Sequence, residues 1–287
     1  MKKILMLALM IYSGYASDAQ IDTPAASPAG SVSTTVGLTE VKIDYSRPRT
    51  KGRKIFGDGP TFLTPYGKAW RTGANGGTKI TFSDDVKVEG IAVPKGEYLI
   101  LTWPGATEWT VSLYKDIKLG GNVSEYNAAQ DAAKFKVKAE KLADRVEQLT
   151  FSIGDLTEDN KTAKVQLAWE NTSVKFGVTV DFDSKVMASI DKTMAGTPDG
   201  DNYFAASVYY LETGRDLKKA LDWMDKSLAA QKDGAPYWML YQKARIQKGL
   251  GNKAGAIATA TASKEAAAKA KNADYEKMND TLITSLK

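Results

Sequence analysis

The sequence of 287 residues contains neither cysteine nor histidine. Without cysteine there is no disulfide, no thiolate nucleophile and no residue that could carry a lipoprotein anchor. Without histidine, a Ser-His-Asp triad and histidine-ligated zinc sites are excluded as well. Acidic pairs near residues 84, 183 and 199 lack the spacing of a calcium-binding loop. We therefore predict neither a metal site nor a cofactor.

The sequence also lacks a strong excess of either charge and a long apolar run beyond its N-terminus. The formal net charge is only +5, and no basic stripe follows a helical face, so we expect no nucleic-acid partner. A membrane-spanning helix needs about 20 consecutive apolar residues. No stretch of the chain reaches that length, and we expect no stable membrane insertion.

The N-terminal residues have the three parts of a secretory signal peptide. Two lysines precede a short apolar run at residues 4–11, and small residues follow. Ser17, Asp18 and Ala19 fit the small-x-small cleavage rule, so residues 1–19 are the predicted leader and Gln20 begins the mature chain. Cleavage three residues earlier and an uncleaved anchor are the alternatives. The pattern predicts a periplasmic or secreted protein.

The rest of the chain changes its hydrophobic period once. After a polar lead-in at residues 20–30, residues 31–180 hold short β-branched runs separated by turn signals, which predicts an antiparallel β-sandwich. Residues 181–200 are expected to form a linker with one helix, and residues 201–287 have helical periodicity. The predicted fold class is therefore α+β in two domains. The predicted strands are 31–36, 39–45, 79–82, 86–88, 98–103, 109–114, 135–139, 149–153, 165–169 and 174–178.

The helical part contains an internal repeat. At an offset of 36 residues, Ala220 matches Ala256 and Ser227 matches Ser263. Small residues at matched positions let two antiparallel helices approach closely, as in tetratricopeptide repeats. We predict tetratricopeptide-like helical hairpins, with an unrelated pair of hairpins as the alternative. Such a module would contact a protein of the cell envelope.

The β-rich part contains the motifs DYSRP (44–48), KGRKIFG (51–57), PYG (65–67), WRTGAN (70–75), PKGEY (94–98) and EWTV (108–111). These motifs resemble the bacterial family catalogued as domain of unknown function 2911. The resemblance extends over roughly residues 30–180 and implies an exported β-rich protein, with no established activity. Two departures are the missing tryptophan at residues 115–121 and the pair Gly76 and Gly77 in place of an acidic and a small residue.

A long loop after the second predicted strand holds the candidate site. Five arginine and lysine residues lie within the eight residues 47–54, and aromatic residues follow closely. Guanidinium groups beside aromatic rings suit a carboxylate, phosphate or sugar ligand. We predict a site for an anionic or glycan ligand at one end of the sandwich. Its residues are Asp44, Arg47, Lys51, Arg53, Trp70, Arg71 and Asn75.

A structural interpretation of the same cations stays open. Arg47, Arg53 and Arg71 would tie the long loop to the sheet by pairing with Asp44 or with backbone carbonyls, because the polar groups of a loop must be satisfied. Truncating Arg53 separates the two interpretations. Loss of a ligand contact weakens binding alone, whereas loss of a tie lowers stability by roughly 1–3 kcal/mol.

The apolar residues of the loop carry a further expectation. A segment this long is ordered only if its apolar groups dock, so we expect Ile55, Phe56 and Trp70 to be buried against the sheet. The cations between them would then gather at one concave rim.

These observations favour a binding or scaffolding protein over an enzyme. The alternative is a hydrolase that needs neither histidine nor cysteine and cleaves cell-envelope glycans through Asp44 or Glu108. A glycosidase requires two converging carboxyl groups, one of them with a raised pKa. A binding protein requires only cations and aromatic residues around a hollow.

Overall fold

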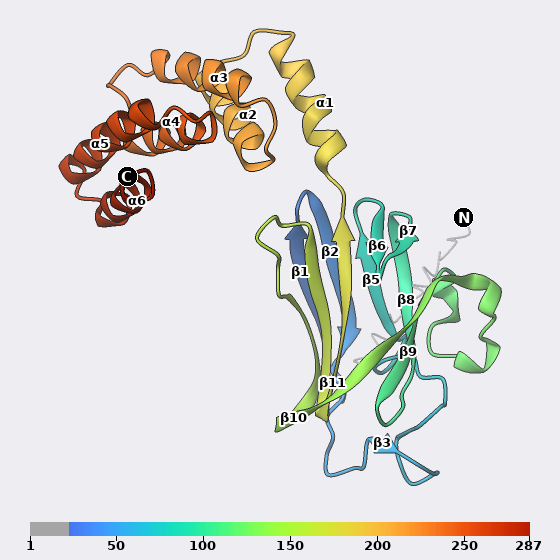
Figure 1. Cartoon of the computed structure of the whole chain (residues 1–287). Helices are drawn as coiled ribbons and strands as arrows, with labels where there is room; N and C mark the ends of the chain where they lie inside the picture. The colour runs from blue at the N-terminus through green and yellow to red at the C-terminus, as the bar shows by residue number, and fades with distance from the viewer. Residues whose placement is uncertain (1–22) are drawn as a thin grey trace, which may run out of the picture. The chain divides into compact units, whose positions relative to one another are not determined.

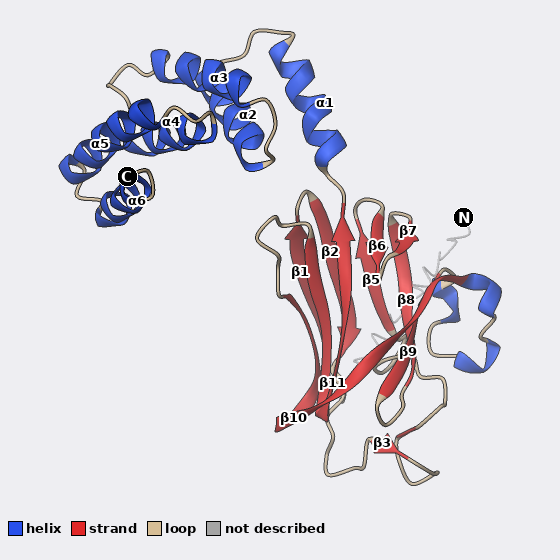
Figure 2. Ribbon diagram, viewed as in Figure 1, coloured by secondary structure: helices blue, strands red, loops and turns tan. Residues whose placement is uncertain are grey.

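The computed structural model describes residues 23–287, which form two compact units that divide between Phe182 and Asp183. The predicted α+β fold class is confirmed, since the first unit is an antiparallel sheet and the second consists of helices (Figure 1 and Figure 2). The predicted leader and the Gln20 start lie outside the described residues. Within residues 23–287, no helix is long and apolar enough to cross a membrane.

The first unit is one nine-stranded sheet in the order β1-β2-β5-β8-β9-β10-β11-β6-β7, in which all neighbours are antiparallel. A short parallel pair, β3 and β4, lies in the loop between β2 and β5. The strands are β1 (Ala29–Val36), β2 (Thr39–Ser46), β3 (Phe56–Gly57), β4 (Thr64–Pro65), β5 (Thr78–Phe82), β6 (Val86–Val88), β7 (Ile91–Val93), β8 (Gly96–Trp103), β9 (Glu108–Tyr114), β10 (Asp131–Gly154) and β11 (Thr162–Val180).

Strands β10 and β11 are much longer than the sequence predicts. The predicted strands 135–139 and 149–153 are both part of β10, and β11 likewise joins two predicted strands. Register shifts between Lys141 and Thr150 absorb extra residues without ending the pairing. Because β10 pairs with β9 in its first half and with β11 throughout its second, it joins the two layers of the sandwich.

The core lies between these layers. Ile43, Ile80, Leu113 and Val165 are fully buried members of one hydrophobic cluster that draws on strands from both layers. Aromatic side chains also contact across the layers. The rings of Tyr45 on β2 and Phe151 on β10, for example, meet edge to face with 5.1 Å between their centroids.

The second unit consists of helices joined by short turns. Side-chain caps define several of the starts: Asp199 caps α2 in a reciprocal capping box with Asn202, and Asp216 caps α3. The helices are α1 (Asp183–Met194), α2 (Gly200–Glu212), α3 (Leu217–Ala229), α4 (Tyr237–Gly249), α5 (Lys253–Lys269) and α6 (Ala273–Thr284).

The internal repeat is visible as a repeated hydrogen bond. The hydroxyl of Ser227 on α3 donates to the carbonyl of the first residue of α2 (2.7 Å), and that of Ser263 on α5 donates to the carbonyl of the first residue of α4 (2.7 Å). Ala220 and Ala256, at matched positions of the same helices, are fully buried. The pairs α2–α3 and α4–α5 are therefore two copies of one hairpin.

Candidate functional site

The long loop between β2 and β5 docks onto the sheet through its apolar residues. Ile55 and Phe56 are buried, as predicted, and Trp70 is half-buried. Phe56 meets Trp109 of β9 edge to face, with 4.8 Å between ring centroids. Trp70 stacks on Trp169 of β11, with 5.8 Å between ring centroids. These four aromatic rings form a single cluster that holds the loop against both layers of the sandwich.

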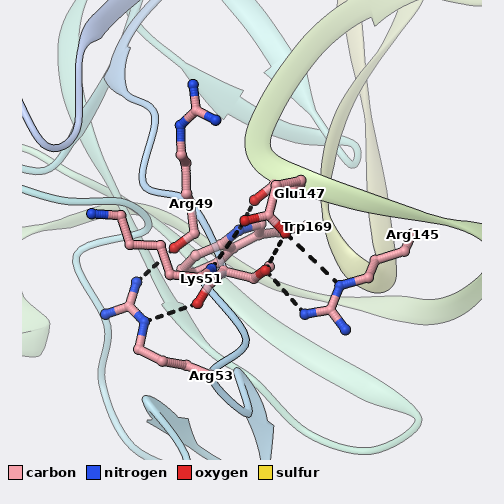
Figure 3. A network of polar contacts seen from close by, with 7 residues as sticks. Arg49, Lys51, Arg53, Arg145, Glu147 and Trp169 are labelled. Atoms are coloured by element: carbon pink, nitrogen blue, oxygen red, sulfur yellow. Dashed lines mark hydrogen bonds and ion pairs between the residues drawn. The ribbon is translucent and has the colours of Figure 1, made fainter.

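The first turn of the loop is fastened to β10 by its backbone and by one carboxylate (Figure 3). The amide of Thr50 donates to the carbonyl of Glu147 (2.9 Å), and the amide of Leu149 donates to that of Pro48 (3.0 Å). The Thr50 hydroxyl and the Lys51 amide both donate to the Glu147 carboxylate. Glu147 therefore organises the turn that carries the predicted cations.

Neutral oxygen atoms hold the arginine side chains around this turn. Arg53 donates to the carbonyls of Arg49 (2.6 Å) and Thr50 (3.0 Å). Arg145 donates through Nη2 to the Thr50 hydroxyl (3.0 Å), while its Nε lies 4.0 Å from the Glu147 carboxylate. Arg53 does bond backbone carbonyls, but these belong to its own turn, so its side chain closes the turn and does not itself tie the loop to the sheet.

Arg49 has a neutral acceptor of its own. Its Nε and Nη2 lie 3.1 and 3.2 Å from the amide oxygen of Gln148, in the amide orientation that satisfies the hydrogen bonds. The Lys51 ammonium points away from the Glu147 carboxylate in Figure 3. We call the exposed side chains of this region the cation cluster, namely Arg49, Lys51, Arg53, Lys54 and Arg145.

Glu147 is the carboxylate bound within the cation cluster. Its pKa is lowered from the ordinary value of 4.5, first by the hydrogen bond from the Thr50 hydroxyl, then by the Lys51 amide and by the charges of Arg145 and Arg49. The positive charges of Arg145 and Arg49 thus act on one ionised carboxylate. Because neutral oxygen atoms make most of the ties, they fix the guanidinium groups without cancelling their charge.

The other predicted residues have different surroundings. Asp44 pairs with Lys42 (2.9 Å) on its own strand and not with an arginine of the loop. Asn75 donates to the Ser46 hydroxyl (3.0 Å). The stem of Arg47 lies against Gly30, where an added Cβ would come within 3.0 Å of its Cδ.

Arg71 is packed in a similar way against Gly121, where an added Cβ would lie 3.2 Å from its Cδ. The Nε atoms of Arg47 and Arg71 are both buried and have no hydrogen-bond partner within residues 23–287. Of the seven predicted site residues, the structure therefore brings Lys51 and Arg53 into the cation cluster and Trp70 into the aromatic cluster beneath the loop. The other four, Asp44, Arg47, Arg71 and Asn75, have other neighbours.

The carboxylates considered for glycan hydrolysis each have a lysine partner. Glu108 pairs with Lys136 (2.7 Å). Burial acts to raise the pKa of Asp44, but hydrogen bonds from Lys42 and Ser31 outweigh it and lower that pKa below its ordinary value. A general acid needs the opposite shift. Within residues 23–287, no group of three or more acidic residues is placed to hold a metal ion.

Sequence reasoning missed Arg145 and Glu147, which lie about 95 residues beyond the turn that they organise. The only signal was the charged stretch around residues 140–147, which interrupts the apolar alternation of β10 at its register shifts.

The protein therefore has two units (Figure 1). The first is an antiparallel β-sandwich with a cation-rich loop at one end, and the second consists of helical hairpins. Residues 27–178, more than half of the chain, match the model of the family described as protein of unknown function (DUF2911), and the chain belongs to that family. No curated protein and no solved structure matches it.

Proposed function

We propose that this protein is a binding protein that holds an anionic glycan at the cation cluster of its β unit. The observation that carries the proposal is the exposed cation cluster, in which hydrogen bonds to neutral oxygen atoms hold the guanidinium groups of Arg53 and Arg145. A planar guanidinium fixed in this way presents its remaining N–H groups to carboxylate or phosphate oxygens in pairs.

The exposure of the cluster favours a chain with several acidic groups over a small enclosed ligand. Its cations come from two segments, the turn at residues 49–54 and the β10 segment at Arg145. Single contacts between exposed charges contribute little, and salt screens them. A polymer that meets several cations at once gains affinity from their sum.

Calorimetric titration of the full chain with an oligogalacturonate, with a neutral malto-oligosaccharide of equal length as comparison, tests the proposal. The double variant Lys51→Gln/Lys54→Gln removes two charges that make no described ion pair, and we expect roughly tenfold weaker binding of the acidic sugar. Lys87→Gln removes an exposed lysine of β6 and is the matched control. Equal binding of the neutral sugar, or unchanged binding by the double variant, contradicts the proposal.

We also propose that the chain is exported, with residues 1–19 removed, and that its ligand is met in the periplasm or outside the cell. The three-part leader and the missing lipid-acceptor cysteine support this proposal. N-terminal sequencing of the exported protein should read from Gln20. An intact Met1 in the membrane fraction would contradict it.

A further inference from the structure

The helical unit contains a groove of about 600 Å³ along three of its helices. Its apolar lining comes from Leu211 of α2, Tyr241 of α4, and Met278 and Leu282 of α6. Met278 is 39% exposed, which is high for a large apolar side chain. An apolar surface that stays open to solvent in a hollow of this size is typical of a binding site.

Polar contacts between helices form the rim of the groove. Arg245 on α4 donates to Glu212 at the end of α2 (2.5 Å), and Lys248 on α4 donates to the hydroxyl of Ser285 just beyond α6 (2.9 Å). These contacts fix α2, α4 and α6 around the groove. The site is therefore formed before any partner arrives, which lowers the entropic cost of binding.

The rim carries uncompensated positive charge. Arg245 is paired with Glu212, but neither Lys248 nor Lys277 makes an ion pair within residues 23–287. The one acidic residue of the adjoining hollow along α6, Asp280, is already held by Lys264 of α5 (2.6 Å). Two ammonium groups thus border an apolar floor, and no carboxylate in the described part of the chain is paired with them.

The shape of this region fits an elongated partner. The adjoining hollow along α6 shares Lys277, Thr281 and Ser285 with the groove, so the two are continuous along the helix. A small molecule would leave most of such an open channel empty. An extended polypeptide can instead place apolar side chains on the floor and acidic ones against the rim.

We infer that this groove binds an extended segment of a partner protein in which acidic residues alternate with apolar ones. Charge complementarity decides the occupant, because Lys248 and Lys277 require carboxylates and the floor requires aliphatic or aromatic side chains. The inference is independent of the glycan site, since it uses residues of the helical unit alone.

Selection from a random dodecapeptide library on the full chain tests this inference. We expect enriched peptides with aspartate or glutamate next to leucine, isoleucine or phenylalanine. A resynthesised enriched peptide should bind the double variant Lys248→Glu/Lys277→Glu at least tenfold more weakly, and its affinity for the unchanged protein should fall with added salt. The matched control is Lys253→Glu/Lys269→Glu, which reverses two exposed lysines of α5 outside the groove and should bind normally.

Three results would overturn the inference: no enrichment, enrichment without acidic residues, or equal loss of binding in the control variant. Far-ultraviolet circular dichroism of both double variants should match that of the unchanged protein, since all four lysines are exposed. Oligogalacturonate binding measured on the same variants should be unaffected. Failure of the groove is thereby distinguished from failure of the glycan site.

Discussion

The two units place cations at a surface in different ways. In the β unit, the cation cluster depends on contacts between residues about 95 positions apart, such as Thr50 with Glu147. In the helical unit, Lys248 lies on α4 and Lys277 on α6, two helices that are close in the sequence and line the same groove. The first arrangement requires the whole sandwich to be folded, whereas the second requires only neighbouring helices.

This difference predicts how far a substitution spreads. Contacts of high sequence separation form a cooperative core, so damage at one point should loosen the loop, the aromatic cluster and the cation cluster together. Helical hairpins that contact mainly their neighbours behave more nearly as a sum of local terms. Variants in each unit can therefore test whether the comparison holds.

The largest effect is expected from Trp109→Ala. Trp109 is fully buried and meets the rings of Phe56 and Trp70, so its truncation should lower the stability of the β unit by about 3–5 kcal/mol. Urea unfolding followed by pulsed hydrogen exchange and mass spectrometry measures the two units separately, because peptides from each unit are observed individually. Tryptophan fluorescence would mix the two signals, since Trp223 and Trp238 belong to the helical unit. The helical transition should keep its midpoint.

Trp109→Phe is the matched control for this prediction. The indole Nε1 of Trp109 is buried without a hydrogen-bond partner in the described part of the chain, so phenylalanine loses volume but no polar contact. Its cost should be clearly smaller than that of alanine. Equal shifts of both transitions in Trp109→Ala would show that the two units unfold together. That result would contradict the proposed difference between them.

The same contrast explains what the sequence could and could not predict. The short β-branched runs of residues 31–180 and the helical periodicity of residues 201–287 are local patterns, and they predicted the two kinds of structure. The tie between Thr50 and Glu147 is not local. Its partners meet only because β10 continues through its register shifts, which no short-range pattern indicates.

The candidate site shows the same limit. Apolar content predicted that Ile55 and Phe56 dock, because burial depends on residue type. Charge alone could not decide which arginines would share a surface. Arg53 closes its own turn, whereas Arg47 and Arg71 lie along glycines from other segments.

The next largest effect concerns the repeated serines. Ser227→Ala removes one hydrogen bond and should cost about 1 kcal/mol. Ser263 also accepts from the Asn279 amide (2.9 Å), and Asn279 is fully buried with an unpaired Oδ1. Ser263→Ala should therefore cost about 1–3 kcal/mol. Thermal unfolding of both variants measures the difference, and equal losses would contradict the role assigned to Asn279.

A smaller effect is expected when Arg53 is replaced. Arg53→Ala removes two bonds to carbonyl oxygens at an exposed turn and should lower stability by about 0.5–1.5 kcal/mol while weakening oligogalacturonate binding. Arg53→Lys keeps the charge but loses the planar fork. It should show a similar loss of stability, and its binding of the acidic sugar should also weaken, though less than in Arg53→Ala because the charge remains. If both variants are as stable as the unchanged protein, the hydrogen bonds of Arg53 to the carbonyl oxygens do not contribute to the free energy of unfolding.

The smallest effect concerns the Glu147 carboxylate and pH. Its pKa is lowered in the folded chain because the ionised form accepts hydrogen bonds from Thr50 and Lys51 and lies near Arg145. A lowered pKa means that the ionised carboxylate stabilises the fold at pH values above its ordinary pKa of 4.5. This contribution is lost as the pH falls through the pKa of the folded state.

Glu147→Gln keeps an acceptor oxygen but has no charge to lose. The unchanged protein should therefore exceed Glu147→Gln in unfolding midpoint at pH 7, and the gap should narrow as the pH falls below 4.5. A gap that stays constant with pH would show that the side chain acts only through its shape, and that the charge of the cation cluster needs no internal counter-ion. The Lys248→Glu/Lys277→Glu variant should leave this gap unchanged, because its residues belong to the other unit.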